Sequence, residues 1–284
     1  MSLHIKSIAV LLLAAACTAC EKPISDDLTA RQVTFVTVGE NGTLRTASES
    51  FRRLNFMVYD ADGFRLWSKV RTQVAPSDSF GTVNIPLPAG THYLLAVGHS
   101  SEVSATLSGP QDVRFTASDG QKLTDTFSYL GTLTAADTDQ TLFMQRISAM
   151  FRLVMTDSLL PPDVHRLRFD YKGGSANFNP LTLQGITKST QSEVRRITQN
   201  GVYEVFTFPY MADECLLQMT VSALDALDNV VYSRQFLNVP VRRNYVTSFT
   251  GQFFSSSDNG TIDASQTSMS FSVDEWQTMY NFTF

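Results

Sequence analysis

The stretch "LRFDY", residues 167–171, decides the fold class of this chain. Successive side chains of a β-strand point to opposite faces, so Leu167, Phe169 and Tyr171 share one face, while the Arg and Asp between them share the other. The stretch "LQMTVS", residues 217–222, alternates in the same way. This alternation predicts strands that bury one face and expose the other.

Alternating stretches recur along the chain and are separated by turn-forming residues. Further examples are "FRLVM", "VYEVFTF" and "MSFSV", whereas the 3.6-residue period of a helix is almost absent after the leader. Clusters of Gly, Pro, Asn and Asp fall between the strands, at residues 60–63, 88–90, 172–174, 200–201 and 228–229. Many short strands separated by turns predict an all-β chain built from β-sandwiches.

The order of the segments indicates an internal repeat. "NFMVYDADGFRLWSKV" from Asn55 and "QMTVSALDALDNVVYSRQF" from Gln218 each resemble a strand, an acidic turn and a return strand. They are followed by "NIPLPAGTHYLLAVGH" and "NVPVRRNYVTSFTG", which share the positions of Asn, Pro and a Tyr-bearing strand. Pro86 and Pro240 cannot donate a ladder hydrogen bond, so we expect each at a strand start or a sheet edge. The sequence therefore predicts two copies of one sandwich topology, which meet near residues 137–145.

The leader ends in "LLLAAACTACEKPISDD", residues 11–27, which bears on where the protein resides. A basic Lys6 and a short apolar run are typical of a secretory signal peptide, and the run is shorter than the about 20 residues of a membrane-spanning helix. Two cysteines close the run, so it resembles a bacterial lipobox, in which a thiol receives a diacylglycerol. We predict Cys20 as the acylated residue because charge and proline follow it, with Cys17 as the alternative. The other interpretation is a plain signal peptide with incidental cysteines.

These patterns divide the chain into parts. We expect a signal peptide at residues 1–19 and a charged tether at 20–32, which is too polar to build a core. An N-terminal β-sandwich follows at 33–142 and a C-terminal β-sandwich at 143–284. The second sandwich ends in a strand or tail at 255–284.

Composition excludes several function classes. The 284 residues include 22 Lys and Arg against 27 Asp and Glu, a net charge of −5, with no block of basic residues, which argues against nucleic acid as a partner. If Cys20 is acylated, Cys215 is the one thiol left in the exported chain, so no disulfide framework is expected. The 20 Phe and nine Tyr must supply the core, and such residues favour strands.

Four segments carry a resemblance to a known family. "RISAMFRLVMTDSL", "RLRFDYKGGSANFNPLTL", "VYEVFTFPY" and "VPVRRNYVTSFTGQFF" are similar to the fimbrillin-related proteins of the Bacteroidetes, closest to the fimbrial anchor or minor-subunit branch. "VYDADG" and "PAGTHYLLAVGH" fit the same pattern, so the resemblance covers roughly residues 33–254. It implies two transthyretin-like sandwiches with an Ig-like Greek-key order, in tandem in a lipoprotein of the outer membrane. Asp26 and Asp27 resemble the acidic signal that sends such lipoproteins to the cell surface.

The resemblance also implies partners and a processing step. Family members assemble with pilin subunits by strand exchange, after an Arg-specific protease removes the first strand of a stalk subunit. Arg45, in "TLRTAS", lies where such cleavage occurs, and Arg31 is a second candidate. Because anchor-type members keep their first strand, the alternative is that both are uncut arginines. The acylated cysteine would attach the protein to outer-membrane lipid durably.

The C-terminal stretch "SMSFSVDEWQTMYNFTF" alternates twice behind a polar linker. Such a strand could be exchanged with a neighbouring subunit, and its candidate residues are Met269, Phe271, Val273, Tyr280, Phe282 and Phe284. The alternative is that this strand closes its own C-terminal sandwich, since proteins usually cover apolar edges internally.

No catalytic or metal-binding pattern is found. His92 and His99 are separated by an odd spacing on one strand, so they should point to opposite faces, and we expect packed or surface histidines, His165 included. Asp60 and Asp62 begin like a calcium loop, but a hairpin turn explains them equally well. Cys215 should be a buried small hydrophobe. We therefore expect no enzyme, no cofactor, no metal and no small-molecule substrate.

Two main functions compete. The leading hypothesis is a lipid-anchored subunit of a cell-surface fimbria that accepts or terminates a neighbour's strand. The alternative is a surface lipoprotein that acts as an adhesin or binds a glycan or host ligand; a tip adhesin would combine both. Glycan platforms usually need exposed aromatic rings, and Trp67 and Trp276 are the two tryptophans. A hydrolase is the third candidate and lacks a catalytic set.

Overall fold

A computed structural model describes residues 28–39, 42–102, 104–115, 123–134, 139–254, 260–264 and 279–283. The leader with Cys17 and Cys20 lies outside these residues, as does Trp276. Four of the candidate exchange residues, Met269, Phe271, Val273 and Phe284, also lie outside them.

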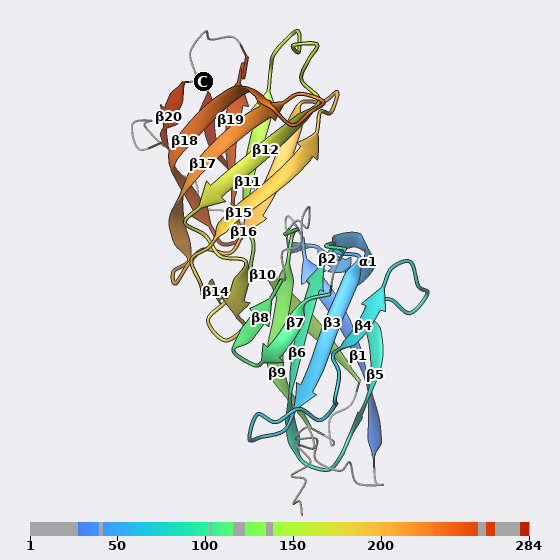
Figure 1. Ribbon diagram of the computed structural model, residues 1–284. Coiled ribbons are helices and arrows are strands. Elements are labelled where there is room, and N and C mark those ends of the chain that lie inside the picture. Colours follow the sequence, from blue (N-terminus) through green and yellow to red (C-terminus); the bar gives the residue numbers. More distant parts are fainter. Residues whose placement is uncertain are drawn as a thin grey trace, which may run out of the picture.

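The regular secondary structure of the described residues is nearly all strand, with one four-residue helix, so the all-β prediction is confirmed. The N-terminal part contains β1 (Thr29–Val38), β2 (Leu44–Thr46), α1 (Ala47–Ser50), β3 (Arg53–Tyr59), β4 (Arg71–Val74), β5 (Thr82–Leu87), β6 (Thr91–His99), β7 (Thr106–Gly109), β8 (Asp112–Arg114), β9 (Phe127–Thr134) and β10 (Gln140–Arg146). The C-terminal part contains β11 (Ala149–Met155), β12 (Arg166–Lys172), β13 (Asn177–Asn179), β14 (Gln184–Gly185), β15 (Thr190–Arg196), β16 (Val202–Thr207), β17 (Glu214–Leu224), β18 (Val230–Arg242), β19 (Val246–Gly251), β20 (Thr261–Asp263) and β21 (Met279–Thr283). We refer to β1–β10 as the first repeat and to β11–β21 as the second repeat; they form the lower and upper lobes of Figure 1.

Apart from β7 and β8, the first repeat is one continuous sheet that folds over its own core. Its strand order is β2-β1-β10-β9-β6-β3-β4, and β5 pairs with β1. β10 joins the two layers, because residues 140–144 pair in parallel with β1 whereas residues 145–146 pair with β9. A strand that passes from one layer to the next closes a sandwich at its corner.

Apart from β13 and β14, the second repeat consists of two separate sheets. One has the order β16-β11-β19-β21 and the other has the order β15-β12-β17-β18-β20. Their facing sides enclose a second hydrophobic core, in which the side chains of Leu167, Phe169 and Tyr171 are at most 1 % exposed. The prediction from "LRFDY" is therefore confirmed, since Arg168 and Asp170 point away from that core and are partly exposed.

The same strand pairings occur in both repeats. The first strand of each repeat pairs in parallel with a later strand, β1 with β10 and β11 with β19. The antiparallel pairs of β1 with β5, β3 with β4, β3 with β6 and β6 with β9 correspond to those of β11 with β16, β12 with β15, β12 with β17 and β17 with β18. Seven strands thus follow one another in the same order and share these five pairings, which supports a repeated topology; the pairing of β10 with β9 has no counterpart between β19 and β18.

The particular segments predicted to be equivalent are not equivalent. The predicted match from Asn55 and Gln218 aligns β3 with β17, whereas the pairings align β3 with β12. The shared Asn-x-Pro pattern instead reflects two edge positions. Among the described strands, β5 with Pro86 pairs with β1 alone, and Pro240 lies beyond the part of β18 that pairs with β20. A proline at a sheet edge loses no ladder hydrogen bond, so it recurs in unrelated strands.

The two repeats share a small sheet at their junction, seen between the lobes in Figure 1. β8 of the first repeat pairs with β13 of the second in a sheet of order β14-β13-β8-β7. Phe178 and Phe208 of the second repeat are fully buried in the core of the first repeat, with ring centroids 5.0 Å apart. The predicted division into residues 33–142 and 143–284 stays a prediction, and β10 runs across its boundary.

Candidate functional site

The first strand is enclosed by its own sheet. β1 pairs with β10 along one edge and with β5 and β2 along the other. Its inward side chains, Val33, Phe35 and Thr37, are at most 1 % exposed. Removal of β1 would leave the facing backbone groups of β10 and β5 without hydrogen-bond partners, and the core would lose a row of side chains.

The two candidate processing residues lie in different surroundings. Arg31 is half-buried within β1, where it stands opposite Ile85 of β5. Arg45 is exposed in the short edge strand β2, opposite Thr37. Because Arg45 is exposed and Arg31 is half-buried, Arg45 is the more accessible of the two to a protease.

The last strand is also paired within the chain. β21 lies parallel to β19 at the edge of its sheet, with Val246 opposite Met279 and Thr250 opposite Thr283. The backbone of Tyr280 and Phe282 therefore belongs to this edge strand. This arrangement is the intrachain alternative that the sequence left open, and exchange of the strand between subunits stays a prediction.

The histidines are packed or exposed, as predicted. His92 is buried and its Nε2 lies 3.0 Å from the carbonyl oxygen of Pro88, whereas His165 is exposed. His99 is fully buried; its Nδ1 accepts the backbone N–H of Ser101, so its Nε2 carries the proton and donates to Asn55 Oδ1 at 2.8 Å.

The environment of His99 favours the neutral imidazole. Burial, and then the nearby positive charge of Arg53, lowers the pKa of His99 to about 3. Within the described ranges, no group of three or more His, Cys, Asp or Glu side chains could hold a metal ion. The predictions of no enzyme activity and no cofactor stay predictions.

The acidic turn after β3 is a hairpin turn. Asp60 Oδ1 accepts the backbone N–H groups of Asp62 at 3.0 Å and Phe64 at 2.9 Å, and Gly63 has a positive φ of 84°. These bonds fix the carboxylate within its own loop. The hairpin interpretation of the Asp60 motif is therefore the one that the geometry supports.

Cys215 and Trp67, two residues singled out in the sequence, both pack against neighbouring side chains. Cys215 is half-buried against the second core, and burial raises the pKa of its thiol, which does not favour a reactive thiolate. Trp67 is buried, with its ring edge-on to Phe56 and the Arg71 guanidinium 4.2 Å from its centroid. Trp67 thus offers no exposed aromatic platform.

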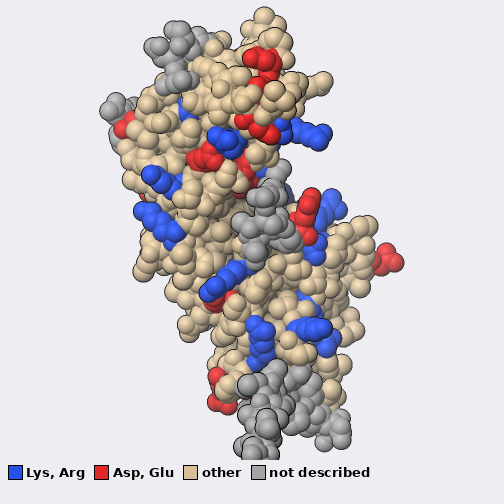
Figure 2. Space-filling model, in the orientation of Figure 1, with Lys and Arg blue, Asp and Glu red and all other residues tan. Residues whose placement is uncertain are grey.

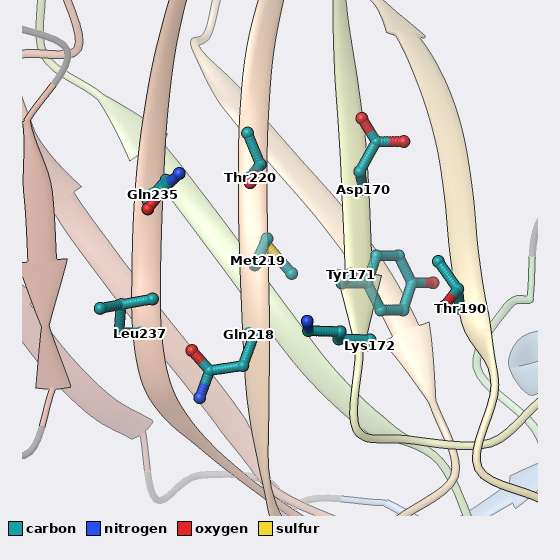
Figure 3. Close-up of a pocket in the computed structure, with 9 residues that line it drawn as sticks. All are labelled: Asp170, Tyr171, Lys172, Thr190, Gln218, Met219, Thr220, Gln235 and Leu237. Atoms are coloured by element: carbon teal, nitrogen blue, oxygen red, sulfur yellow. The ribbon is translucent and has the colours of Figure 1, made fainter.

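A polar hollow of about 340 Å³ on the second repeat was missed by the sequence analysis. It opens on the outer face of the sheet formed by β15, β12, β17 and β18, as Figure 3 shows. Its polar side chains are Asp170, Lys172, Thr190, Gln218, Thr220 and Gln235. The alternation within one strand predicts only that these residues point outward. Which of them lie side by side depends on the register between strands, which the sequence does not show.

The hollow lies beside a β-bulge. Leu237 and Asn238 of β18 stand together opposite Gln218 of β17, and Asn238 has a positive φ of 53°. Gln218 Nε2 donates to Asn238 Oδ1 at 3.2 Å, and Asn238 Nδ2 donates to Asp263 Oδ1 at 2.9 Å. Asn tolerates this left-handed conformation better than most residues, which is the one signal that the sequence carried.

The surface carries charges of both signs. On the face drawn in Figure 2, Lys and Arg side chains are interspersed with Asp and Glu, with wide uncharged areas between them. Among the described residues, no helix is long and apolar enough to cross a membrane. In the part of the chain that the structure describes, the candidate sites are thus the strand edges of two all-β repeats and the polar hollow of the second.

This chain belongs to a family of unknown function, DUF6562, whose model matches residues 112–281. No curated protein matches it. Among solved structures it is similar to a DUF1812 protein from Bacteroides thetaiotaomicron, at 11 % identity and a TM-score of 0.50, over 74 % of this chain and 80 % of that chain. This likeness confirms the β-sandwich fold class that the resemblance implied, and the number of domains stays a prediction.

Two fimbrial proteins are also among the structural neighbours. The fimbrial anchor protein Mfa2 from Porphyromonas gingivalis is 14 % identical, with a TM-score of 0.40 over 72 % of this chain and 81 % of that chain. A fimbrial assembly protein from Parabacteroides distasonis is 10 % identical, with a TM-score of 0.43 over 79 % of this chain and 91 % of that chain. The fold assignment depends on the DUF1812 protein and not on these two.

Proposed function

We propose that this chain is a lipid-anchored subunit of a cell-surface fimbria, an anchor or minor assembly component, which pairs with pilin by β-strand exchange. The leader supports this role because Cys20, or alternatively Cys17, lies in a stretch that resembles a lipobox. The fold and the family-like motifs agree with it. The observation that carries the proposal is the edge of β19.

The edge of β19 is filled by a strand that comes from far along the chain. β21 is separated from β20 by residues 264–278, and it pairs in parallel with β19 along residues 246–250. On β19, the side chains of Val246, Thr247, Ser248 and Phe249 are at most 3 % exposed. An uncovered edge of this kind would leave unpaired backbone groups beside buried side chains, and an added strand satisfies both at once.

The positions of the strands agree with an anchored subunit. β1 begins at the end of the first repeat that faces away from the second repeat, and β20 lies in the opposite lobe (Figure 1). A lipid attached shortly before β1 would hold the second repeat, with the β19 edge, away from the membrane. We propose that the chain keeps β1, since that strand fills the first core; cleavage at Arg45 or Arg31 would be a step of stalk subunits.

The proposal is tested by removing the last strand. A chain that ends at Ala264 lacks β21 and should bind a peptide of residues 276–284 saturably, whereas the full-length chain should not, because its edge is already occupied. The truncated chain should also capture pilin from fimbriae sheared off cells. Calorimetric titration with the peptide and co-purification of a pilin ladder are the measurements.

A peptide of the same composition in scrambled order is the matched control. The strand-exchange proposal is wrong if the truncated chain keeps its melting temperature and ignores both peptides. A full-length protein recovered strictly as a monomer from fimbriated cells would count against the fimbrial role itself.

The alternative function, a surface adhesin that binds a glycan or host ligand, is supported by a different observation. The buried Trp67 gives it no support, but the polar hollow of the second repeat does. Adhesion and assembly use different parts of the molecule, so one chain can carry both.

A further inference from the structure

The outer face of the second repeat carries an ordered grid of hydrogen-bonding side chains. Across four adjacent strands, Ser192, Asp170, Thr220 and Gln235 stand directly opposite one another. The next outward row contains Thr190, Lys172 and Gln218. Directly paired residues have Cβ atoms about 5 Å apart, and the two rows are about 6.7 Å apart along the strand.

The polarity of a solvated sheet face is ordinary, so it is not by itself evidence of a site. The bulge in β18 is the distinguishing feature, because bulges bend a strand locally and re-aim its side chains. The left-handed Asn238 and its bonds to Gln218 and Asp263 hold the bulge in place. The hollow of about 340 Å³ beside it falls within the range of small-molecule sites, about 300–1,000 Å³.

The two charged groups of the hollow differ in their surroundings. Asp170 Oδ1 accepts the hydroxyl of Ser192 at 2.6 Å and Oδ2 accepts Arg168 Nε at 2.8 Å, so the carboxylate is held in place and still has unused lone pairs. Lys172 forms no ion pair with any carboxylate in the described part of the chain. The hollow thus combines an oriented acceptor with a cation that lacks a described counter-charge.

The lining excludes stacking as a binding mode. Tyr171 is the one aromatic residue of the lining, and its hydroxyl points into the core, where Glu193 Oε1 lies at 2.7 Å and the carbonyl oxygen of Phe206 at 2.9 Å as hydrogen-bond acceptors. Affinity must therefore come from hydrogen bonds and charge. Figure 3 shows that Gln218, Thr220 and Gln235 bring amide and hydroxyl groups to the same face as Lys172 and Asp170.

We propose that this hollow binds an acidic sugar residue of the uronic acid class. The sugar carboxylate would accept hydrogen bonds from the Lys172 ammonium, while its ring hydroxyls would donate to Asp170 and exchange hydrogen bonds with Thr220 and Gln235. A pyranose with a carboxylate at one end and hydroxyls at the other matches two rows of side chains of unlike charge. The proposal deepens the alternative function, the glycan-binding adhesin, and it is independent of the fimbrial role because the site lies apart from the β19 edge.

The test uses the purified full-length chain, with sodium glucuronate and the neutral methyl glucoside as probes. Backbone chemical-shift titration should show glucuronate binding in the millimolar range, with shifts on β12, β17 and β18, and weaker binding of the glucoside. Lys172→Met should weaken glucuronate binding about tenfold, since hydrogen bonds to charged groups contribute the largest share of such affinity. Thr220→Val, an isosteric change in the other row, should weaken both probes.

Lys69→Met is the matched control, because Lys69 is an exposed lysine of the first repeat. The proposal is overturned if Lys172→Met and Lys69→Met bind glucuronate alike, if the two probes bind equally well, or if neither probe gives saturable shifts. Unchanged melting temperatures of the variants would establish that any loss of binding is local.

Discussion

The two repeats share their strand pairings but differ at one edge. In the first repeat, the closing strand β10 pairs with β1 on one side and with β9 on the other. In the second repeat, the equivalent strand β19 pairs with β11 but not with β18, and β21 occupies its other side. The loss of one antiparallel contact thus divides a continuous sheet into two and creates a position for an additional strand. A single pairing decides whether a repeat is closed or can accept a strand.

The second repeat also contributes side chains to the core of the first repeat. We expect the largest loss of stability from a mutation that removes one of them. Phe208→Ala removes a ring that contacts Phe178 and Phe115, and truncation of a buried Phe typically costs about 3–5 kcal/mol. Because Phe208 follows β16 but is buried in the first core, we expect faster amide hydrogen exchange in β6 and β8 as well.

Phe169→Ala is the matched control for this prediction, since Phe169 is fully buried in the second core. It should destabilise the second repeat by a similar amount and leave exchange in β6 unchanged. If the two variants have the same exchange pattern, the repeats do not divide the chain in the way that their cores indicate.

The first repeat should be more sensitive to acid because it contains His99. The pKa of His99 is about 3 in the folded chain, below the about 6.5 of an unfolded histidine, so the unfolded state binds more protons between these values. Stability therefore falls as the pH falls below 6.5. Relative to a His99→Gln variant, the wild-type chain should lose about 2 kcal/mol between pH 6.5 and pH 5.

Urea unfolding at the two pH values measures this difference. His165→Gln is the control, because His165 is exposed and its replacement should preserve the acid sensitivity of the wild type. Equal pH dependence in the wild type and His99→Gln would show that the buried imidazole does not contribute.

The smallest effect is expected at Arg45. Arg45→Gln alters an exposed side chain in a short edge strand and should change the free energy of unfolding by less than about 0.5 kcal/mol. It should nevertheless abolish the first cut made by an Arg-specific protease on the folded chain. Mass spectrometry of the fragments would locate the cut, and a first cut at Arg31 would contradict the enclosure of β1.

The class of fold was predictable from the sequence because alternation within a strand is local. Among the described residues, "LRFDY" and "LQMTVS" bury the predicted faces, and the hairpin turn at Asp60 is specified by its own residues. The junction was not predictable, since β8 and β13 are three residues long and have no period to detect. Neither was the hollow, because its grid depends on the register of residues such as Asp170 and Thr220, far apart in the chain.

The parallel pairing of the opening strand of each repeat has a mechanical consequence. In each repeat, the start of the opening strand and the end of its parallel partner lie at opposite ends of one ladder, β1 with β10 and β11 with β19. A pull applied between the start of the opening strand and the end of its parallel partner would shear that ladder, so its hydrogen bonds would have to break together rather than one after another. This geometry would make a protein that is anchored at one end resist mechanical unfolding by a force applied at the other end.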